Sequence, residues 1–174
     1  MVLSLFRKKT ATEPVFAVYS AIVAQSRQPR FYAEWGVPDT VTGRFDMISL
    51  HLALVLRRLR AERDAKVFSQ TLFDLFFKDM DRSLREMGAG DLAVPKKIRK
   101  MGEIFYGLLA SLDTALTDGE PAGVEAVLLR NVYAEPIAAM APQFATYLLD
   151  EASRLTLVPA SRIMAGHLDL GQAA

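Results

Sequence analysis

The most apolar stretch of the chain runs from Met47 to Leu56. Apolar residues in and beside it recur at i, i+4, i+7 and i+11, the spacing of one face of an α-helix. Ile48, Leu52, Val55 and Leu59 form that face, and Met47, Leu50, Leu54 and Leu56 fill most of the other sides. A helix that is apolar nearly all round is buried in a bundle or lies in a membrane, and a membrane span needs about 20 apolar residues. The pattern therefore predicts a buried central helix near residues 44–60.

Helical spacing of apolar residues recurs along the rest of the chain. We expect helices at residues 12–27, 29–35, 64–87, 94–118, 124–132 and 142–155, with a final turn at 159–165. No stretch alternates apolar and polar residues between turn signals, as hairpin strands do. The sequence therefore predicts one all-α domain of about seven or eight helices over residues 12–165. A mobile segment (1–11) is expected before it and a loose tail (166–174) after it.

The residues before the central helix are typical of a tight turn. Gly36 can adopt positive φ, Pro38 fixes its own φ, and Asp39 and Thr40 have short acceptor side chains suited to turns and helix N-caps. We expect Arg44 to pair with Asp39 across this turn. For Arg44 and Asp46 two roles remain open, namely shaping the turn and making a polar contact with a partner.

Composition narrows the class of protein. The chain has 174 residues, enough for one domain of ordinary size, and no cysteine, so it has no disulfide framework and no thiolate metal site. Its net charge of +1 conceals an asymmetry: residues 1–102 have a net charge of +7 and residues 103–174 of −6. This asymmetry indicates either an anion-seeking surface or two halves that neutralise each other by packing together.

Four cations lie where a helix disfavours them, in the first two turns of the helix that Pro95 helps to begin. They are Lys96, Lys97, Arg99 and Lys100. The helix dipole opposes each of them by about 0.3–1 kcal/mol. The cluster indicates a docking surface for RNA phosphates, anionic lipid headgroups or an acidic segment. The alternative is a solvated face helped by Asp91 and Glu103.

Aromatic residues provide further candidates for partner binding. Phe73 and Phe77 widen the apolar arc of the predicted 64–87 helix to about half its circumference, more than a surface helix needs. That helix is either wedged between two neighbours or partly open to a partner. Phe31 and Trp35 are expected in the core, whereas Tyr32 suits either the core or an interface.

His51 lies on the apolar central helix, and His167 is the other histidine of the chain. We expect a buried His51 bonded to a backbone carbonyl and not a haem ligand. The sequence has no nucleotide-binding glycine loop, no metal-spaced cluster and no nucleophile–base pair. We therefore predict no catalytic residue, no metal and no cofactor, and we do not expect an enzyme.

Two stretches resemble the ubiquinol–cytochrome c chaperone family, whose members are assembly factors for cytochrome b of respiratory complex III. Residues 36–59 read GVPDTVTGRFDMISLHLALVLRRL, and residues 94–107 read VPKKIRKMGEIFYG. The signature positions in the first stretch are Gly36, Pro38, Asp39, Gly43, Arg44, Asp46 and His51. The resemblance implies a chaperone that binds newly made cytochrome b near the ribosome or the inner membrane surface. Mitochondrial members work with a small partner protein.

On this interpretation the candidate partner-binding residues are Tyr32, Phe73, Phe77, Lys96, Lys97, Arg99 and Lys100. The start, MVLSLFRKKT, lacks the pattern of a secretory signal or a transit peptide. We therefore expect a bacterial cytoplasmic protein, peripherally associated with the inner membrane. One rival is a peripheral membrane or lipid-binding helical scaffold without a specific client. The other is an enzyme with an unrecognised helical active site.

Overall fold

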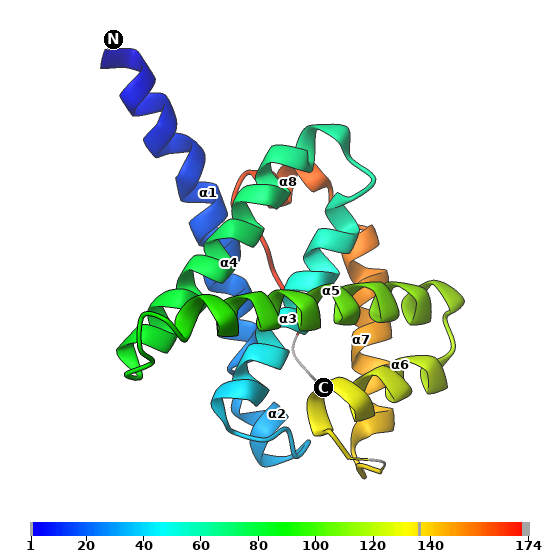
Figure 1. Cartoon of the computed structure of the whole chain (residues 1–174). Helices are drawn as coiled ribbons and strands as arrows, with labels where there is room; N and C mark the ends of the chain where they lie inside the picture. Colours follow the sequence, from blue (N-terminus) through cyan, green and yellow to red (C-terminus); the bar gives the residue numbers. More distant parts are fainter. Residues whose placement is uncertain (1, 136, 172–174) are drawn as a thin grey trace.

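The structure, a computed structural model, describes residues 2–135 and 137–171, and the side chains from residue 13 onward. Within these residues it is all-helical, without a strand, as predicted (Figure 1). The α-helices are α1 (Val2–Ser26), α2 (Pro29–Ala33), α3 (Val41–Leu59), α4 (Lys66–Glu86), α5 (Val94–Asp118), α6 (Pro121–Leu128), α7 (Ala141–Thr156) and α8 (Ala160–Met164). A 3₁₀ turn η1 (Arg63–Ala65) precedes α4, and a π-helical turn η2 (Leu129–Tyr133) follows α6.

Helix α3 is the centre of the domain. It contacts α1, α4, α5 and α7, and α5 runs across it in the view of Figure 1. Residues 47–55 are all buried, which confirms the predicted central helix. The helix begins at Val41, earlier than expected, because the Thr40 side chain accepts a hydrogen bond from Gly43 N at 3.1 Å and so caps it.

The turn before α3 is fixed by close contacts. Gly36 has a φ of +70°, which favours glycine. A Cβ on Gly43 would lie 2.0 Å from the Pro38 carbonyl oxygen, so no larger residue fits there without moving the backbone. Arg44 Nε and Asp39 Oδ1 are 2.7 Å apart, which confirms the expected ion pair. These contacts set the angle at which the chain enters α3.

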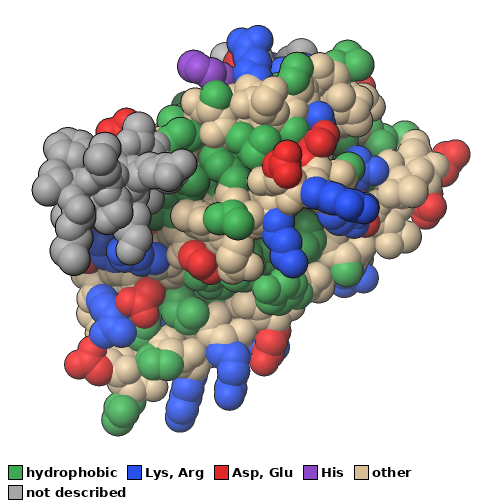
Figure 2. All heavy atoms as spheres, turned by 90° about the horizontal axis from the view of Figure 1, so that it is seen from above, with side chains coloured by type: hydrophobic (Ala, Val, Ile, Leu, Met, Phe, Trp, Pro, Cys, Tyr) green, Lys and Arg blue, Asp and Glu red, His purple; other side chains and the backbone are tan. Residues whose placement is uncertain are grey.

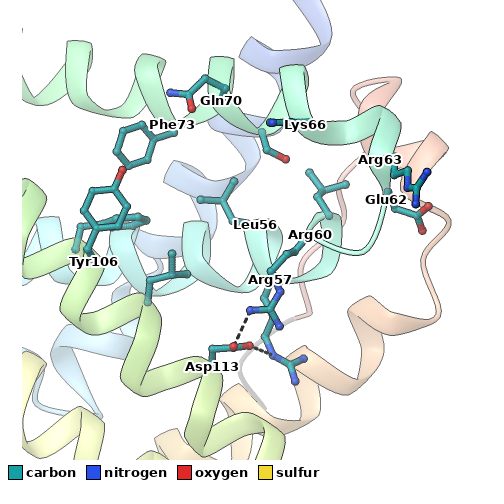
Figure 3. A pocket seen from close by; sticks show the side chains of 14 residues that line it. Leu56, Arg57, Arg60, Glu62, Arg63, Lys66, Gln70, Phe73, Tyr106 and Asp113 are labelled. Atoms are coloured by element: carbon teal, nitrogen blue, oxygen red, sulfur yellow. Dashed lines mark hydrogen bonds and ion pairs between the residues drawn. The ribbon is translucent and has the colours of Figure 1, made fainter.

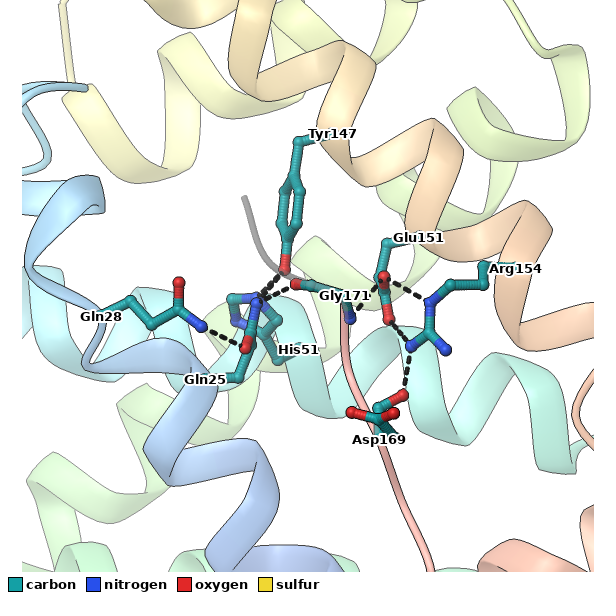
Figure 4. Close-up of polar contacts among 8 residues, drawn as sticks. All are labelled: Gln25, Gln28, His51, Tyr147, Glu151, Arg154, Asp169 and Gly171. Carbon is teal, nitrogen blue, oxygen red and sulfur yellow. Dashed lines mark hydrogen bonds and ion pairs between the residues drawn. The ribbon is translucent and has the colours of Figure 1, made fainter. Parts of the chain in front are cut away.

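His51 is fully buried and both of its ring nitrogens are engaged. Nδ1 donates to the Met47 carbonyl at 2.8 Å, as expected for a structural histidine. The Tyr147 hydroxyl accepts from Gln25 Nε2 at 2.7 Å and donates to His51 Nε2 at 3.0 Å (Figure 4). Burial lowers the pKa of His51 to about 4, so the ring is neutral near pH 7. This network joins α1, α3 and α7.

The expectation of a loose tail is wrong for residues 166–171. Gln25 Nε2 donates to the Gly171 carbonyl at 2.6 Å, and Gly171 N donates to Glu151 Oε2 at 3.0 Å (Figure 4). Arg154 holds the same carboxylate with an Nη2–Oε1 distance of 2.6 Å. Leu170 is buried beside this network. The tail lacks regular structure, but hydrogen bonds to its backbone hold it against the domain. The amino-acid composition of the tail does not predict such bonds.

Two element boundaries also differ from the predictions. Pro14 lies inside α1 and not at its start, since its fixed φ is compatible with a helix. Asp64 belongs to η1, and Ala65 is the N-cap of α4 without a side-chain cap. The prediction that residues 1–11 are mobile stays a prediction, because Met1 and the side chains of residues 2–12 lie outside the described part of the chain. Among the described residues, no helix is long and apolar enough to cross a membrane.

The charge asymmetry of the two halves is partly neutralised by packing. Asp113 on α5 pairs with both Arg57 and Arg60 at the end of α3. Figure 2 shows Lys and Arg interspersed with Asp and Glu and with hydrophobic side chains over one face, not a uniformly basic surface. Of the two explanations for the charge asymmetry, neutralisation by packing is therefore supported in part, because one acidic residue of the second half pairs with two arginines of the first.

Candidate functional site

An open groove of about 570 Å³ lies between α3, α4 and α5 (Figure 3). We call it the aromatic groove. Its apolar lining is Leu56, Leu59, Phe73, Phe105, Tyr106 and Leu109, and its charged lining is Arg57, Arg60, Glu62, Arg63, Lys66 and Asp113. The C-terminal half of α3, the turn that follows it with η1, the N-terminal half of α4 and the middle of α5 supply these residues. Their apolar spacing directs one face of each helix to the core and leaves the groove at the edge.

Aromatic rings join the groove to the core. The ring centroid of Phe73 lies 5.6 Å from that of Tyr106 and 5.7 Å from that of Phe105. Phe105 is fully buried, Phe73 is half-buried and Tyr106 is 59% exposed. Figure 3 shows Phe73 and Tyr106 facing one another from α4 and α5. Such a graded aromatic surface offers apolar area to a partner together with a polar hydroxyl at its edge.

The charged side of the aromatic groove has a fixed geometry. Arg57 Nε lies 3.0 Å from Asp113 Oδ1, and Arg60 Nη1 lies 2.7 Å from Oδ2. The hydrogen bond from Arg60, followed by the other contacts of the two arginines, lowers the pKa of Asp113, so the carboxylate stays ionised. Arg63 and Lys66 are exposed on the same side, and no described residue forms an ion pair with them. The groove is therefore apolar within and net positive along one side.

The predicted partner-binding residues are not gathered at one place. Phe73 lines the aromatic groove, whereas Phe77 packs on Phe76 and Phe105, with centroid distances of 4.9 and 6.0 Å. Tyr32 lies on α2 and lines a different pocket, where its hydroxyl donates to the Ser26 carbonyl at 2.8 Å. The structure therefore brings together Phe73 and Phe77, 4.7 Å apart, and puts Tyr32 elsewhere.

The four predicted cations at the start of α5 are all exposed. Lys97 and Lys100 line a second groove, described below, and Lys100 Nζ lies 3.4 Å from Glu103 Oε2. Lys96 and Arg99 line neither groove. The cluster thus divides between two faces of one helix, and whether it binds a partner stays a prediction.

Sequence reasoning missed Tyr106 and Asp113 as groove residues. Tyr106 belongs to the second family-like stretch, in FYG, and lies next to the core residue Phe105, so its exposed position was a readable signal. Asp113 offered no signal, because only the packing of α5 on α3 brings it to Arg57 and Arg60. In the described part of the chain, no group of three His, Cys, Asp or Glu side chains is arranged to hold a metal ion.

The fold and the site define an all-α domain with open, aromatic-lined grooves between its central helices. Residues 33–170 match the family model described as ubiquinol–cytochrome C chaperone, and the chain belongs to that family. It is similar to the crystal structure of the Cbp3 homolog from Brucella abortus, with a TM-score of 0.88 and 37% identity, covering 99% of this chain and 98% of that one.

A curated relative is more distant. The chain is 24% identical over 116 residues to the ubiquinol-cytochrome-c reductase complex assembly factor 1 of Xenopus laevis. The match covers 66% of this chain and 58% of the relative, so the chain spans little more than half of that protein's length.

Proposed function

We propose that the protein is an assembly chaperone that binds newly synthesised cytochrome b and supports assembly of ubiquinol–cytochrome c reductase, complex III, without catalytic chemistry of its own. The match of residues 33–170 to the chaperone family carries this proposal. The Xenopus relative is named as an assembly factor of the ubiquinol-cytochrome-c reductase complex, which supports the proposed role in assembly.

The aromatic groove gives the proposal a physical mechanism. Unassembled segments of a membrane subunit expose apolar side chains that aggregate unless they are covered. Phe73, Tyr106 and Leu56 offer such a segment an apolar surface between two packed helices, the helix-in-groove mode of recognition. Arg63 and Lys66 beside it favour an acidic residue of the segment or the C-terminal end of a helix.

The proposal is tested by co-purification of cytochrome b with the chain from cells. Tyr106→Ala removes an exposed ring from the aromatic groove and should lower the amount of cytochrome b recovered and of assembled complex III. Leu157→Ala is the matched control, since Leu157 is 83% exposed and lines neither groove. Normal haem-loaded cytochrome b in a strain that lacks the protein and any second copy would refute the function.

We further propose that the protein works at the cytoplasmic face of the inner membrane of a bacterium. Leu92 is 89% exposed and precedes the cations at the start of α5, which suits contact with anionic lipid headgroups or with the ribosome. The same observation favours the alternative of a lipid-binding scaffold without a specific client. Vesicles containing anionic lipid separate the two, because a scaffold binds them equally well with and without cytochrome b. The part played by a small partner protein is tested by the same co-purification.

A further inference from the structure

A second groove, of about 600 Å³, lies between the beginning of α3, the end of α4 and the beginning of α5. We call it the Asp46 groove. Its apolar lining includes Val41, Phe45, Leu84, Met87, Met101 and Ile104. Val41, Met87 and Ile104 are 54%, 52% and 39% exposed, so the groove continues into an apolar patch on the surface. Contiguous exposed apolar area of this kind marks an interaction site.

Asp46 is the unusual member of this lining. Asp46 is only 4% exposed, yet no described residue forms a hydrogen bond or an ion pair with its carboxyl group, which borders the open groove. Its sequence neighbours are engaged elsewhere: Arg44 pairs with Asp39, and the Phe45 ring stacks on Phe76 at 5.5 Å. Lys97 and Lys100 line the α5 side of the same groove, but both are exposed and neither forms an ion pair with Asp46; Lys100 pairs with Glu103. Burial alone raises the pKa of Asp46 to about 7. A buried carboxyl without a donor is costly unless a partner supplies one.

We propose that the Asp46 groove receives an amphipathic segment of cytochrome b that covers the apolar lining and places one Lys or Arg side chain against the Asp46 carboxylate. This inference rests on the proposed function and adds a second contact site with a defined recognition chemistry. The cation donates the hydrogen bond that no described residue donates to Asp46, and its aliphatic stem packs against the apolar lining.

The charges of the groove discriminate between possible occupants. A lipid acyl chain would cover Asp46 without offering it a donor, and a headgroup phosphate would bring a second negative charge to the same place. A cationic side chain on an apolar segment satisfies both the lining and the carboxyl. Lys97 and Lys100, at the α5 side, then face the outer edge of the segment, where an acidic residue or a helix C-terminus complements them.

The test uses synthetic peptides that tile the cytochrome b sequence, with binding to the full chain measured by fluorescence anisotropy. We expect one Lys- or Arg-containing peptide to bind at least about tenfold more weakly to Asp46→Asn than to the native chain. Replacing its cation with norleucine or citrulline should weaken binding to the native chain to a similar extent and have little further effect on Asp46→Asn. Asp74→Asn is the matched control, since Asp74 is an exposed carboxylate of α4 outside both grooves.

The other outcomes each overturn the inference. Equal affinity of every peptide for the native chain and for Asp46→Asn would show that the Asp46 carboxyl does not contribute to peptide binding. A dimer in sedimentation that Ile104→Glu abolishes would assign the groove to a second copy of the chain. Vesicle binding that Val41→Glu abolishes while every peptide fails to bind would assign it to a lipid. If cytochrome b still co-purifies in these cases, the proposed function stands, and if it never co-purifies with the native chain, both fail.

Discussion

Replacing Asp46 with Asn should make the free protein more stable near pH 7.5. Asn matches a neutral aspartic acid in size and polarity, so the change removes the charge and little else. Burial raises the pKa of Asp46 from 3.8 to about 7. Each pKa unit corresponds to about 1.4 kcal/mol, which gives an upper bound of about 4 kcal/mol for the cost of ionising Asp46 in the folded state. Allowing for water that enters the open groove, we expect a gain of about 2–3 kcal/mol in the free energy of unfolding.

The gain should depend on pH with a definite sign. Between pH 3.8 and about 7, Asp46 is protonated in the folded chain and ionised in the unfolded chain, so its contribution falls as pH rises. His51 acts oppositely, because its folded pKa of about 4 lies below the unfolded value of 6.5. The contribution of His51 to the free energy of unfolding is present above pH 6.5 and is lost as pH falls toward 4. The native chain should therefore be nearly insensitive to pH in this window, whereas Asp46→Asn should lose about 3 kcal/mol on acidification.

Urea unfolding followed by circular dichroism at several pH values measures both effects. Asp74→Asn, with an exposed carboxylate, serves as the control and should follow the native curve. A decrease in stability of Asp46→Asn at pH 7.5 would refute the reasoning. It would mean that the Asp46 carboxylate already makes a stabilising contact in the free protein. The Asp46 groove would then have no unpaired carboxylate to bind the cation of a partner.

Three further predictions concern other parts of the chain. His51→Ala removes the hydrogen bonds of the ring with the Met47 carbonyl and the Tyr147 hydroxyl and opens a cavity, so thermal unfolding should show a loss of about 2–4 kcal/mol; a stoichiometric Soret band in the native protein would instead contradict the structural role. Gly43→Ala should cost at least about 2 kcal/mol by the same assay, because the added Cβ meets a backbone oxygen, and an unchanged Tm would contradict this. Replacing Lys96, Lys97 and Lys100 together with Gln should leave stability unchanged or slightly higher, since the helix dipole opposes these charges, while binding to ribosomes, anionic vesicles or cytochrome b weakens most at low salt. A sharp fall in stability with intact salt-dependent binding would make these lysines structural.

The sequence was sufficient to predict the centre of the fold. The run of apolar residues in α3 specifies burial on every side, and the turn before it contains residues whose backbone preferences are strong. Gly36, Gly43 and the Asp39–Arg44 pair act within a few positions of one another, so their spacing along the chain is close to their spacing in the structure. Local physical rules are most reliable under that condition.

Contacts between distant residues could not be predicted in the same way. Asp113 meets Arg57 and Arg60 only because α5 packs across α3, and the pattern of neither helix specifies which residues meet at that crossing. The docking of the tail depends on Gly171, whose amide donates to the Glu151 carboxylate and whose carbonyl accepts from the Gln25 side chain, so the tail contributes only backbone groups to these bonds. A pattern of side-chain types contains no information about such backbone contacts.

Asp46 connects the stability of the free protein with its proposed binding role. Its position in the family-like stretch gave no reason to separate it from Arg44, which is committed to the turn. The structure separates them, because one has a partner and the other, buried beside it, has none among the described residues. A buried residue that lowers the stability of the free protein points to a contact made only in a complex. Stability and binding should therefore change in opposite directions in Asp46→Asn, and an opposite change excludes misfolding as the cause of lost binding.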